Sequence, residues 1–253
     1  MIHKSKKLGL AAAIALAMAM TGTGVAQAAD AAPEAKPDNE FSYNAALVSD
    51  YRYRGISQTR LKPALQGGAD WVNNPTGFYA GAWASTIKWI KDSGGDASVE
   101  IDLYGGKRGE IGQGVSYDVG FLAYVYPSNQ LNPSTNTREL YGQLGYGPAT
   151  LKYSHSVSNL FGFADSKHSS YLDASLNQDL GQGFVLNLHA GHQKVKNWGA
   201  FSYTDWKVGV TKDFGVASVA LAYIDTNNNN YLAPSNGKNL GKGGVVLTVS
   251  KTF

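Results

Sequence analysis

Apolar and polar side chains alternate along most of this chain, from Phe41 to the C-terminus. Residues 184–191 read FVLNLHAG and residues 244–253 read GVVLTVSKTF, and in both segments apolar side chains recur at every second position. Because successive side chains of a β-strand point to opposite faces, this pattern predicts strands with one apolar and one polar face. It predicts about twelve such strands, at residues 41–54, 64–72, 77–87, 98–106, 114–126, 138–146, 150–158, 169–179, 183–193, 202–213, 216–225 and 243–253.

The segments that connect these strands alternate between long and short. The long ones are residues 55–63, 88–97, 127–137, 159–168, 194–201 and 226–242. The short ones are residues 73–76, 147–149, 181–182 and 214–215, and the link at 107–113 has an intermediate length. Such alternation is typical of outer-membrane barrels. The sequence therefore predicts an all-β fold, a closed antiparallel transmembrane β-barrel with short periplasmic turns and longer extracellular loops.

The first 28 residues have the features of a cleavable secretory signal peptide. A basic start and an apolar run at residues 8–20 precede the small residues of the AQA sequence at 26–28. The apolar run is shorter than the roughly 20 residues that a membrane-spanning helix needs, although an N-terminal membrane anchor is the alternative. We expect residues 29–40 to be a flexible segment and residues 41–253 to form the barrel domain.

Removal of the signal peptide changes the charge balance. The whole chain has 22 basic and 19 acidic residues, and residues 1–28 contain three lysines and no acid. The remainder therefore has 19 residues of each sign and a formal net charge of zero, which gives no support to nucleic-acid binding. The chain has no cysteine, so neither a disulfide nor a thiolate metal site is possible.

Aromatic residues cluster near the ends of the predicted strands, where outer-membrane barrels carry aromatic girdles. In the first strand, Tyr43 and Tyr51 are eight residues apart, which is roughly 26 Å at about 3.3 Å per residue. The other aromatics expected at the two membrane interfaces are Phe41, Tyr53, Trp71, Phe78, Tyr126, Tyr146, Phe184, Tyr203 and Phe253. Phe253 also ends the final strand, as does the C-terminal aromatic of a barrel-insertion signal. The alternative is a soluble lipocalin-like or sandwich protein of the periplasm.

Residues 47–59 read LVSDYRYRGISQT, and they are followed by PALQGGADW at 63–71, GFYAGAWAS at 77–85 and VEIDLYGG at 99–106. In these segments the chain resembles the TorF family of porins, which are outer-membrane β-barrels of proteobacteria. The resemblance is sharpest over residues 45–106 and extends over the mature chain. It implies an outer-membrane barrel and, more weakly, transport, but it implies no particular solute and no binding residues.

If the apolar faces point to lipid, the opposite faces line the lumen. The charged residues expected there are Asp50, Arg52, Arg54, Asp70, Glu100, Asp102, Asp118, Glu139, Lys152, Asp173, Asp205 and Lys207. Rings of charge set selectivity in pores, so we expect Arg52 and Arg54 to face acids such as Glu100 and Asp102 across a constriction. The alternative is a paired charge network that fills a closed lumen.

These features favour a porin-like channel for passive diffusion of small hydrophilic solutes over a non-conducting barrel whose loops bind a ligand or partner. The expected partners are outer-membrane lipid, small polar solutes and the barrel-assembly machinery. An enzyme is not expected, because His155 is on the face opposite Ser154 and Ser156 and no acid completes a triad. No cofactor is expected, and a metal pair of His189 and His192 is disfavoured because the two do not share a strand face.

Overall fold

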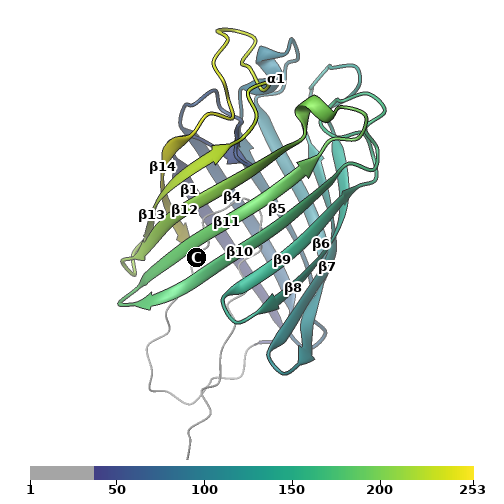
Figure 1. Cartoon of the computed structure of the whole chain (residues 1–253). Coiled ribbons are helices and arrows are strands. Elements are labelled where there is room, and N and C mark those ends of the chain that lie inside the picture. The colour runs from purple at the N-terminus through teal and green to yellow at the C-terminus, as the bar shows by residue number, and fades with distance from the viewer. Residues whose placement is uncertain (1–36) are drawn as a thin grey trace, which may run out of the picture.

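The computed structural model describes residues 37–253, and in them twelve antiparallel strands form a closed barrel (Figure 1). The wall strands are β1 (Asn39–Val48), β4 (Ala64–Asn73), β5 (Phe78–Thr86), β6 (Val99–Gly112), β7 (Val115–Val125), β8 (Thr137–Tyr146), β9 (Ala149–Ser156), β10 (Ser170–Gly181), β11 (Phe184–Lys194), β12 (Tyr203–Asp213), β13 (Ser218–Thr226) and β14 (Gly244–Thr252). Each strand pairs with its neighbours along the chain, and β1 pairs with β14 to close the ring. The predicted fold class and strand number are confirmed.

Four short elements lie outside the wall. They are β2 (Arg52–Tyr53), β3 (Ile56–Ser57), α1 (Trp89–Asp92) and the 3-10 turn η1 (Gly199–Phe201). All of them belong to the long connections, which gather at one end of the barrel, while the tight turns lie at the other end (Figure 1). No helix within residues 37–253 is long or apolar enough to cross a membrane.

Three predicted boundaries are wrong. The first wall strand ends at Val48 rather than at residue 54, because the chain turns into the barrel after that residue. β6 continues to Gly112, with a bulge between Glu110 and Gly112, so most of the predicted link at 107–113 is wall. Asn39 and Glu40, predicted as flexible, already belong to β1. The predicted signal peptide, residues 1–28, lies outside the described residues.

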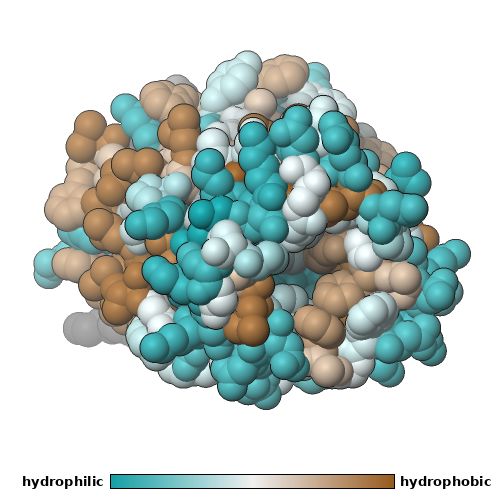
Figure 2. All heavy atoms as spheres, turned by 90° about the horizontal axis from the view of Figure 1, so that it is seen from above, coloured by the Kyte–Doolittle hydropathy of each residue, from teal (hydrophilic) through white to brown (hydrophobic). Residues whose placement is uncertain are grey.

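The two faces of the wall differ in chemistry as the alternation predicts. Large apolar side chains are exposed on the outer face of the wall, among them Leu65, Leu103, Val119, Leu140, Leu144, Leu151, Leu172, Val208, Leu221 and Leu247. Polar side chains of the same strands are buried on the inner face, among them Gln66, Glu100, Asp118, Glu139, Ser154, Asn187, Asp205 and Thr248. Seen from the loop end, hydrophilic side chains cover much of the centre while hydrophobic ones gather along the left flank (Figure 2).

Exposed aromatic residues mark the turn end of the outer surface. Phe41, Phe78, Tyr146, Phe184 and Phe253 are all exposed there. Three other aromatics, which the sequence analysis assigned to the outer girdles, are instead buried inside the barrel: Tyr51, Tyr126 and Tyr203. Strand-end position alone does not distinguish an interfacial tyrosine from an interior one, because a phenol is stable in either place when its hydroxyl has a hydrogen-bond partner.

Gly106 of β6 lies too close to its neighbours to carry a side chain. A Cβ at this position would overlap the carbonyl oxygen of Val119 and the phenol of Tyr79. We expect Gly106→Ala to lower the free energy of unfolding by about 1–3 kcal/mol, because overpacking forces the backbone to shift. Guanidinium unfolding in detergent, followed by circular dichroism of the strands, measures this change.

Gly142→Ala is the matched control on β8. Its Cβ would have only Val119 Cγ1 nearby, at 4.0 Å, so we expect a change within about 0.5 kcal/mol. Equal stability of the two variants would contradict the register that places Gly106 opposite Gly120.

Candidate functional site: the charged lumen

The segment of residues 49–63, which contains β2 and β3, folds into the barrel and lies across its interior. Tyr51 Oη donates a hydrogen bond to Glu100 on β6 at 2.5 Å, and Arg52 Nη1 donates one to the carbonyl oxygen of Lys242 at 2.8 Å. A Cβ on Gly55, which has a φ of +80°, would lie 2.7 Å from Cβ of Asp205 on β12. This inward segment therefore reaches from the β6 wall to the opposite β12 wall.

Hydrogen bonds within the inward segment explain why it leaves the wall. The Asp50 carboxylate accepts hydrogen bonds from Ser57 Oγ at 2.5 Å and from Arg52 Nε at 2.7 Å. These contacts make a compact turn around a buried carboxylate, in place of the extended strand that the alternation predicted. Asp50, Arg52 and Arg54 thus reach the interior from this segment and not from a strand of the wall.

Arg54 forms the main ion pair between the inward segment and the wall. Its guanidinium donates to both oxygens of Glu139 on β8, at 2.7 and 3.1 Å, and to Gln193 Oε1 at 2.7 Å. The guanidinium also lies over the ring of Tyr171, 4.2 Å from its centroid. Both charged side chains are almost fully buried, with 7% and 2% of their surface exposed. A bidentate pair of this kind fixes both the orientation of the guanidinium and its distance from the carboxylate.

The partners of the arginines differ from those that we expected. Arg52 pairs with Asp50 and Arg54 with Glu139, so the ion pairs are made with acids other than Glu100 and Asp102, the two examples that we expected across the constriction. Glu100 accepts hydrogen bonds from Tyr51 and Tyr126 instead, at 2.5 and 2.7 Å. Alternation identifies the face on which a charge lies but not the residue across the lumen, because that depends on how the sheet closes.

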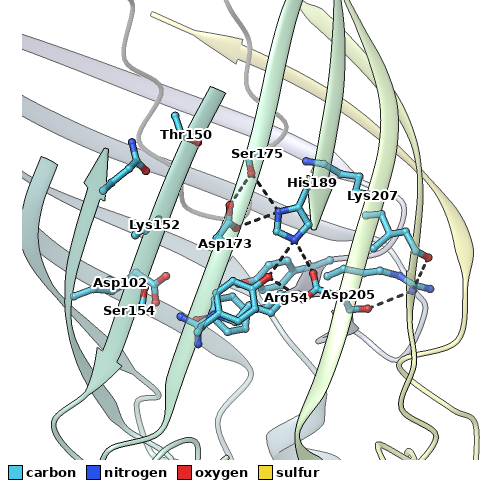
Figure 3. A pocket seen from close by; sticks show the side chains of 18 of the residues that line it. Arg54, Asp102, Thr150, Lys152, Ser154, Asp173, Ser175, His189, Asp205 and Lys207 are labelled. Carbon is cyan, nitrogen blue, oxygen red and sulfur yellow. Dashed lines mark hydrogen bonds and ion pairs between the residues drawn. The ribbon is translucent and has the colours of Figure 1, made fainter. Parts of the chain in front are cut away.

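A cavity of about 180 Å³ lies beside the inward segment, and charged and polar side chains line it together with aromatic and aliphatic ones such as Trp83, Leu122 and Leu188 (Figure 3). Its charged lining residues are Arg52, Arg54, Asp102, Lys152, Asp173, His189, Asp205 and Lys207. Asp70 and Asp118 lie outside this lining and accept hydrogen bonds from Tyr104 and Tyr79, each at 2.5 Å. The wall residues among the lumen candidates therefore meet inside the barrel, around the cavity or beside a tyrosine hydroxyl.

His189 is the cavity residue that the sequence analysis missed. Its Nδ1 lies 3.1 Å from Asp173 on β10, and its Nε2 lies 2.8 Å from Asp205 on β12. The two carboxylates lie on the strands either side of β11, which carries His189. The cluster of Asp173, His189 and Asp205 therefore becomes apparent only from the register of β10, β11 and β12. The alternation gave one signal, since it placed His189 on a polar strand face.

Ser175, His189 and Asp205 are the residue types of a hydrolytic triad, but their hydrogen bonds describe a charge network. Ser175 Oγ donates to Asp173 at 2.7 Å and is 3.3 Å from His189 Nδ1, which Asp173 approaches more closely. A nucleophilic serine must instead give its proton to the histidine. Within residues 37–253, no group of three or more His, Asp or Glu side chains is arranged to hold a metal ion.

A second cavity, of about 290 Å³, lies between the long connections at the loop end. Its lining is mainly aromatic and aliphatic, and includes Tyr53, Ile56, Trp89, Leu160, Phe161, Phe163, Phe201, Tyr203, Tyr231, Leu232 and Leu240. Tyr231 Oη donates to the carbonyl oxygen of Phe201 at 2.7 Å, and burial raises the pKa of this phenol. We call this cavity the aromatic vestibule. Tyr53 lines both cavities, so the inward segment separates them.

A closed twelve-stranded barrel with an apolar exterior and a charged interior is the architecture of small outer-membrane porins. The chain belongs to the Gcw_chp family, described as bacterial proteins of unknown function, whose family model matches residues 31–253. None of the curated proteins compared with the chain matches its sequence.

Solved structures share the fold. The KdgM porin, solved in complex with disordered oligogalacturonate, superposes with a TM-score of 0.54 at 8% sequence identity, covering 84% of this chain and 97% of that one. The NanC porin superposes with a TM-score of 0.52 at 8% sequence identity, and the match covers 84% of this chain and 98% of that one. At this identity the likeness extends to the barrel fold and not to particular lumen residues.

Breaking the buried pair of Arg54 and Glu139 provides a test of how the inward segment is held. We expect Glu139→Gln to lower the free energy of unfolding by about 3–5 kcal/mol, because a buried guanidinium loses its counter-charge. Adding Arg54→Met should recover much of this loss, since no unpaired charge remains. Chemical unfolding of the two single variants and the double variant measures the coupling.

The pair of Lys91 and Asp96 is a suitable control, because both side chains are exposed, at 46% and 65%. Lys91→Met should cost about 1 kcal/mol or less. If the Arg54 and Glu139 substitutions had independent, additive effects, the proposed role of the pair would be wrong.

Proposed function

We propose that this protein is an outer-membrane channel for passive diffusion of small hydrophilic solutes. The observation that carries the proposal is the cavity inside the barrel, about 180 Å³ in volume, where eight charged side chains lie among aromatic and aliphatic ones. A lumen that served only as a packed core would gain more from apolar filling, because buried charges are costly unless they are paired. A twelve-stranded barrel is also wider than the eight-stranded barrels whose interiors side chains fill.

The inward segment would form the narrowest part of this channel. It crosses from β6 to β12 and is fixed by the pairing of Arg54 with Glu139. A constriction made of charged side chains selects solutes by charge and size together. The KdgM porin, which has the same fold, was solved in complex with disordered oligogalacturonate, and that structure supports the idea that such a barrel admits a solute.

The proposal places residues 41–253 in the outer membrane, after export directed by residues 1–28. The tight turns would face the periplasm, and the long connections would face the outside. The lipid would contact the belt of exposed leucines and valines on the wall. The resemblance of residues 45–106 to TorF-family porins supports the same placement, and assembly would depend on the barrel-assembly machinery.

Purified protein should give discrete current steps in planar lipid bilayers, and proteoliposomes should swell in small sugars and amino acids at rates that fall with solute size. Arg54→Ala combined with Glu139→Ala removes the pair that crosses the lumen, so its unit conductance should exceed that of the wild type. Gln178→Ala, on the exposed end of β10, should leave conductance unchanged. Folded protein without any current steps would refute the channel.

The terminal Phe253 should act as a barrel-insertion signal. Its backbone N–H donates to the Tyr43 carbonyl oxygen at 2.8 Å, and its ring is exposed at the turn end. We expect Phe253→Ala to reduce the folded, heat-modifiable band in outer-membrane fractions severalfold, while refolding from urea into detergent stays unchanged. Phe184→Ala removes another exposed aromatic at the same end and should leave the band unchanged. Equal loss in both variants would contradict a specific signal.

A non-conducting barrel that binds a ligand through its loops is the second candidate. The aromatic vestibule favours it, because a cavity of about 290 Å³ lined by aromatic side chains resembles a ligand site more than a path for polar solutes. The bilayer and swelling measurements separate the two candidates.

A further inference from the structure

Asp102 of β6 is a buried carboxylate with an unused acceptor in the lumen cavity. Only 3% of the residue is exposed, and it lines the cavity of about 180 Å³. Its Oδ1 has no hydrogen-bond partner, and no ion pair involves this residue within the described chain. Leaving such a buried group without a hydrogen bond destabilises the fold, and more so when the group is charged. Asp102 is therefore ready to accept a hydrogen bond from a solute.

The neighbouring buried acids differ from Asp102 in this respect. Glu100 accepts hydrogen bonds from two tyrosines, and Glu139 accepts two from Arg54. Protein donors therefore satisfy both glutamates. A chelated metal ion would need several oxygen ligands, and no suitable group of three exists within residues 37–253. A single organic ammonium or amide donor fits Asp102 better.

Lys207 supplies the opposite charge on the opposite wall. It lies on β12, and five strands separate β12 from β6 in either direction around the ring. Lys207 lines the same cavity, and Asp173 and Asp205 are close enough to attract its ammonium without forming an ion pair with it. The nearby carboxylates of Asp173 and Asp205 are both bound to His189. Figure 3 shows Asp102 and Lys207 on opposite sides of the cavity.

We propose that this cavity selects small zwitterions, with the solute's ammonium group toward Asp102 and its carboxylate toward Lys207. The inference rests on the proposed channel function and names its solute class. Both signs of charge line the whole cavity, because Arg52, Arg54, Lys152, Asp173, His189 and Asp205 lie in it with Asp102 and Lys207. A simple anion or a simple cation is therefore attracted by some of these side chains and repelled by others. Only a molecule that carries both charges gains at both walls.

The cavity has room for a small solute. Its volume of about 180 Å³ is roughly ten times the 10–15 Å³ that one water molecule needs by the same measure. A small α-amino acid fits within it. The field between the two walls would orient the amino acid across the lumen as it passes the inward segment.

Proteoliposome uptake of four radiolabelled solutes of similar size tests the proposal: alanine as zwitterion, alaninamide as cation, lactate as anion and lactamide as neutral molecule. The wild type should take up alanine faster than lactamide. Asp102→Asn should slow alanine and alaninamide by about three- to tenfold, as expected for up to about 1.4 kcal/mol of lost attraction, and should not slow lactate. Lys207→Met should slow alanine and lactate but not alaninamide.

Two control variants remove charges of the same sign at positions outside the cavity lining. Asp70→Asn alters a lumen acid outside the cavity lining, and Lys107→Met alters an exposed lysine of β6. Both variants should still take up alanine faster than lactamide, as the wild type does. A heat-modifiable band establishes that each variant is folded, and Asp102→Glu should retain most of the alanine uptake.

The outcomes distinguish this inference from the channel proposal. If lactamide enters the proteoliposomes but alanine has no advantage, the zwitterion site is refuted while the channel stands. Equal slowing of all four solutes by Asp102→Asn refutes it as well, because the substitution would then act through the shape of the lumen. If no solute enters, both proposals fail.

Discussion

Backbone hydrogen bonding between the first and last strands is the interaction on which the rest of this structure depends. β1 pairs with β14 from Asn44 opposite Thr252 to Val48 opposite Thr248, and Tyr43 and Phe253 exchange two further hydrogen bonds. An open sheet would leave two rows of unpaired amides, which water can satisfy but hydrocarbon cannot. Closure also converts the polar face of the sheet into an enclosed volume, so the charges on that face must find partners inside it.

Tyrosine hydroxyls and arginines supply most of those partners. Asp70, Asp118, Glu100 and Asp205 each accept a hydrogen bond from a tyrosine, and Glu139 and Asp50 each meet an arginine. This explains how a chain with 15 tyrosines and no cysteine can hold several buried acids without a disulfide. A phenol satisfies a carboxylate without adding a charge and fills space with its ring. Asp102 is the exception, and it faces the cavity.

The inward segment gives the lumen two chambers of different chemistry. On one side lies the aromatic vestibule, formed by the long connections, and on the other lies the charged cavity inside the wall. A solute that entered from the loop end would exchange contact with rings for contact with charges. Tyr53 and the neighbouring Arg54 lie at this boundary. Arg54 donates hydrogen bonds there to Glu139 and Gln193, which are 85 and 139 positions further along the sequence.

The sequence by itself determined the number of wall strands and, along most of the wall, which side chains lie on its outer and inner faces, because the two-residue period of a β-strand is a local property. Only the tertiary structure decided that the chain leaves the wall after Val48, that Arg54 pairs with Glu139 and that His189 lies between two aspartates. Alternation continues through Tyr51 and Arg54, so nothing local marks the end of β1. Apart from the turn around Asp50, the deciding contacts join distant segments, and their geometry exists only once the sheet has closed with a defined register.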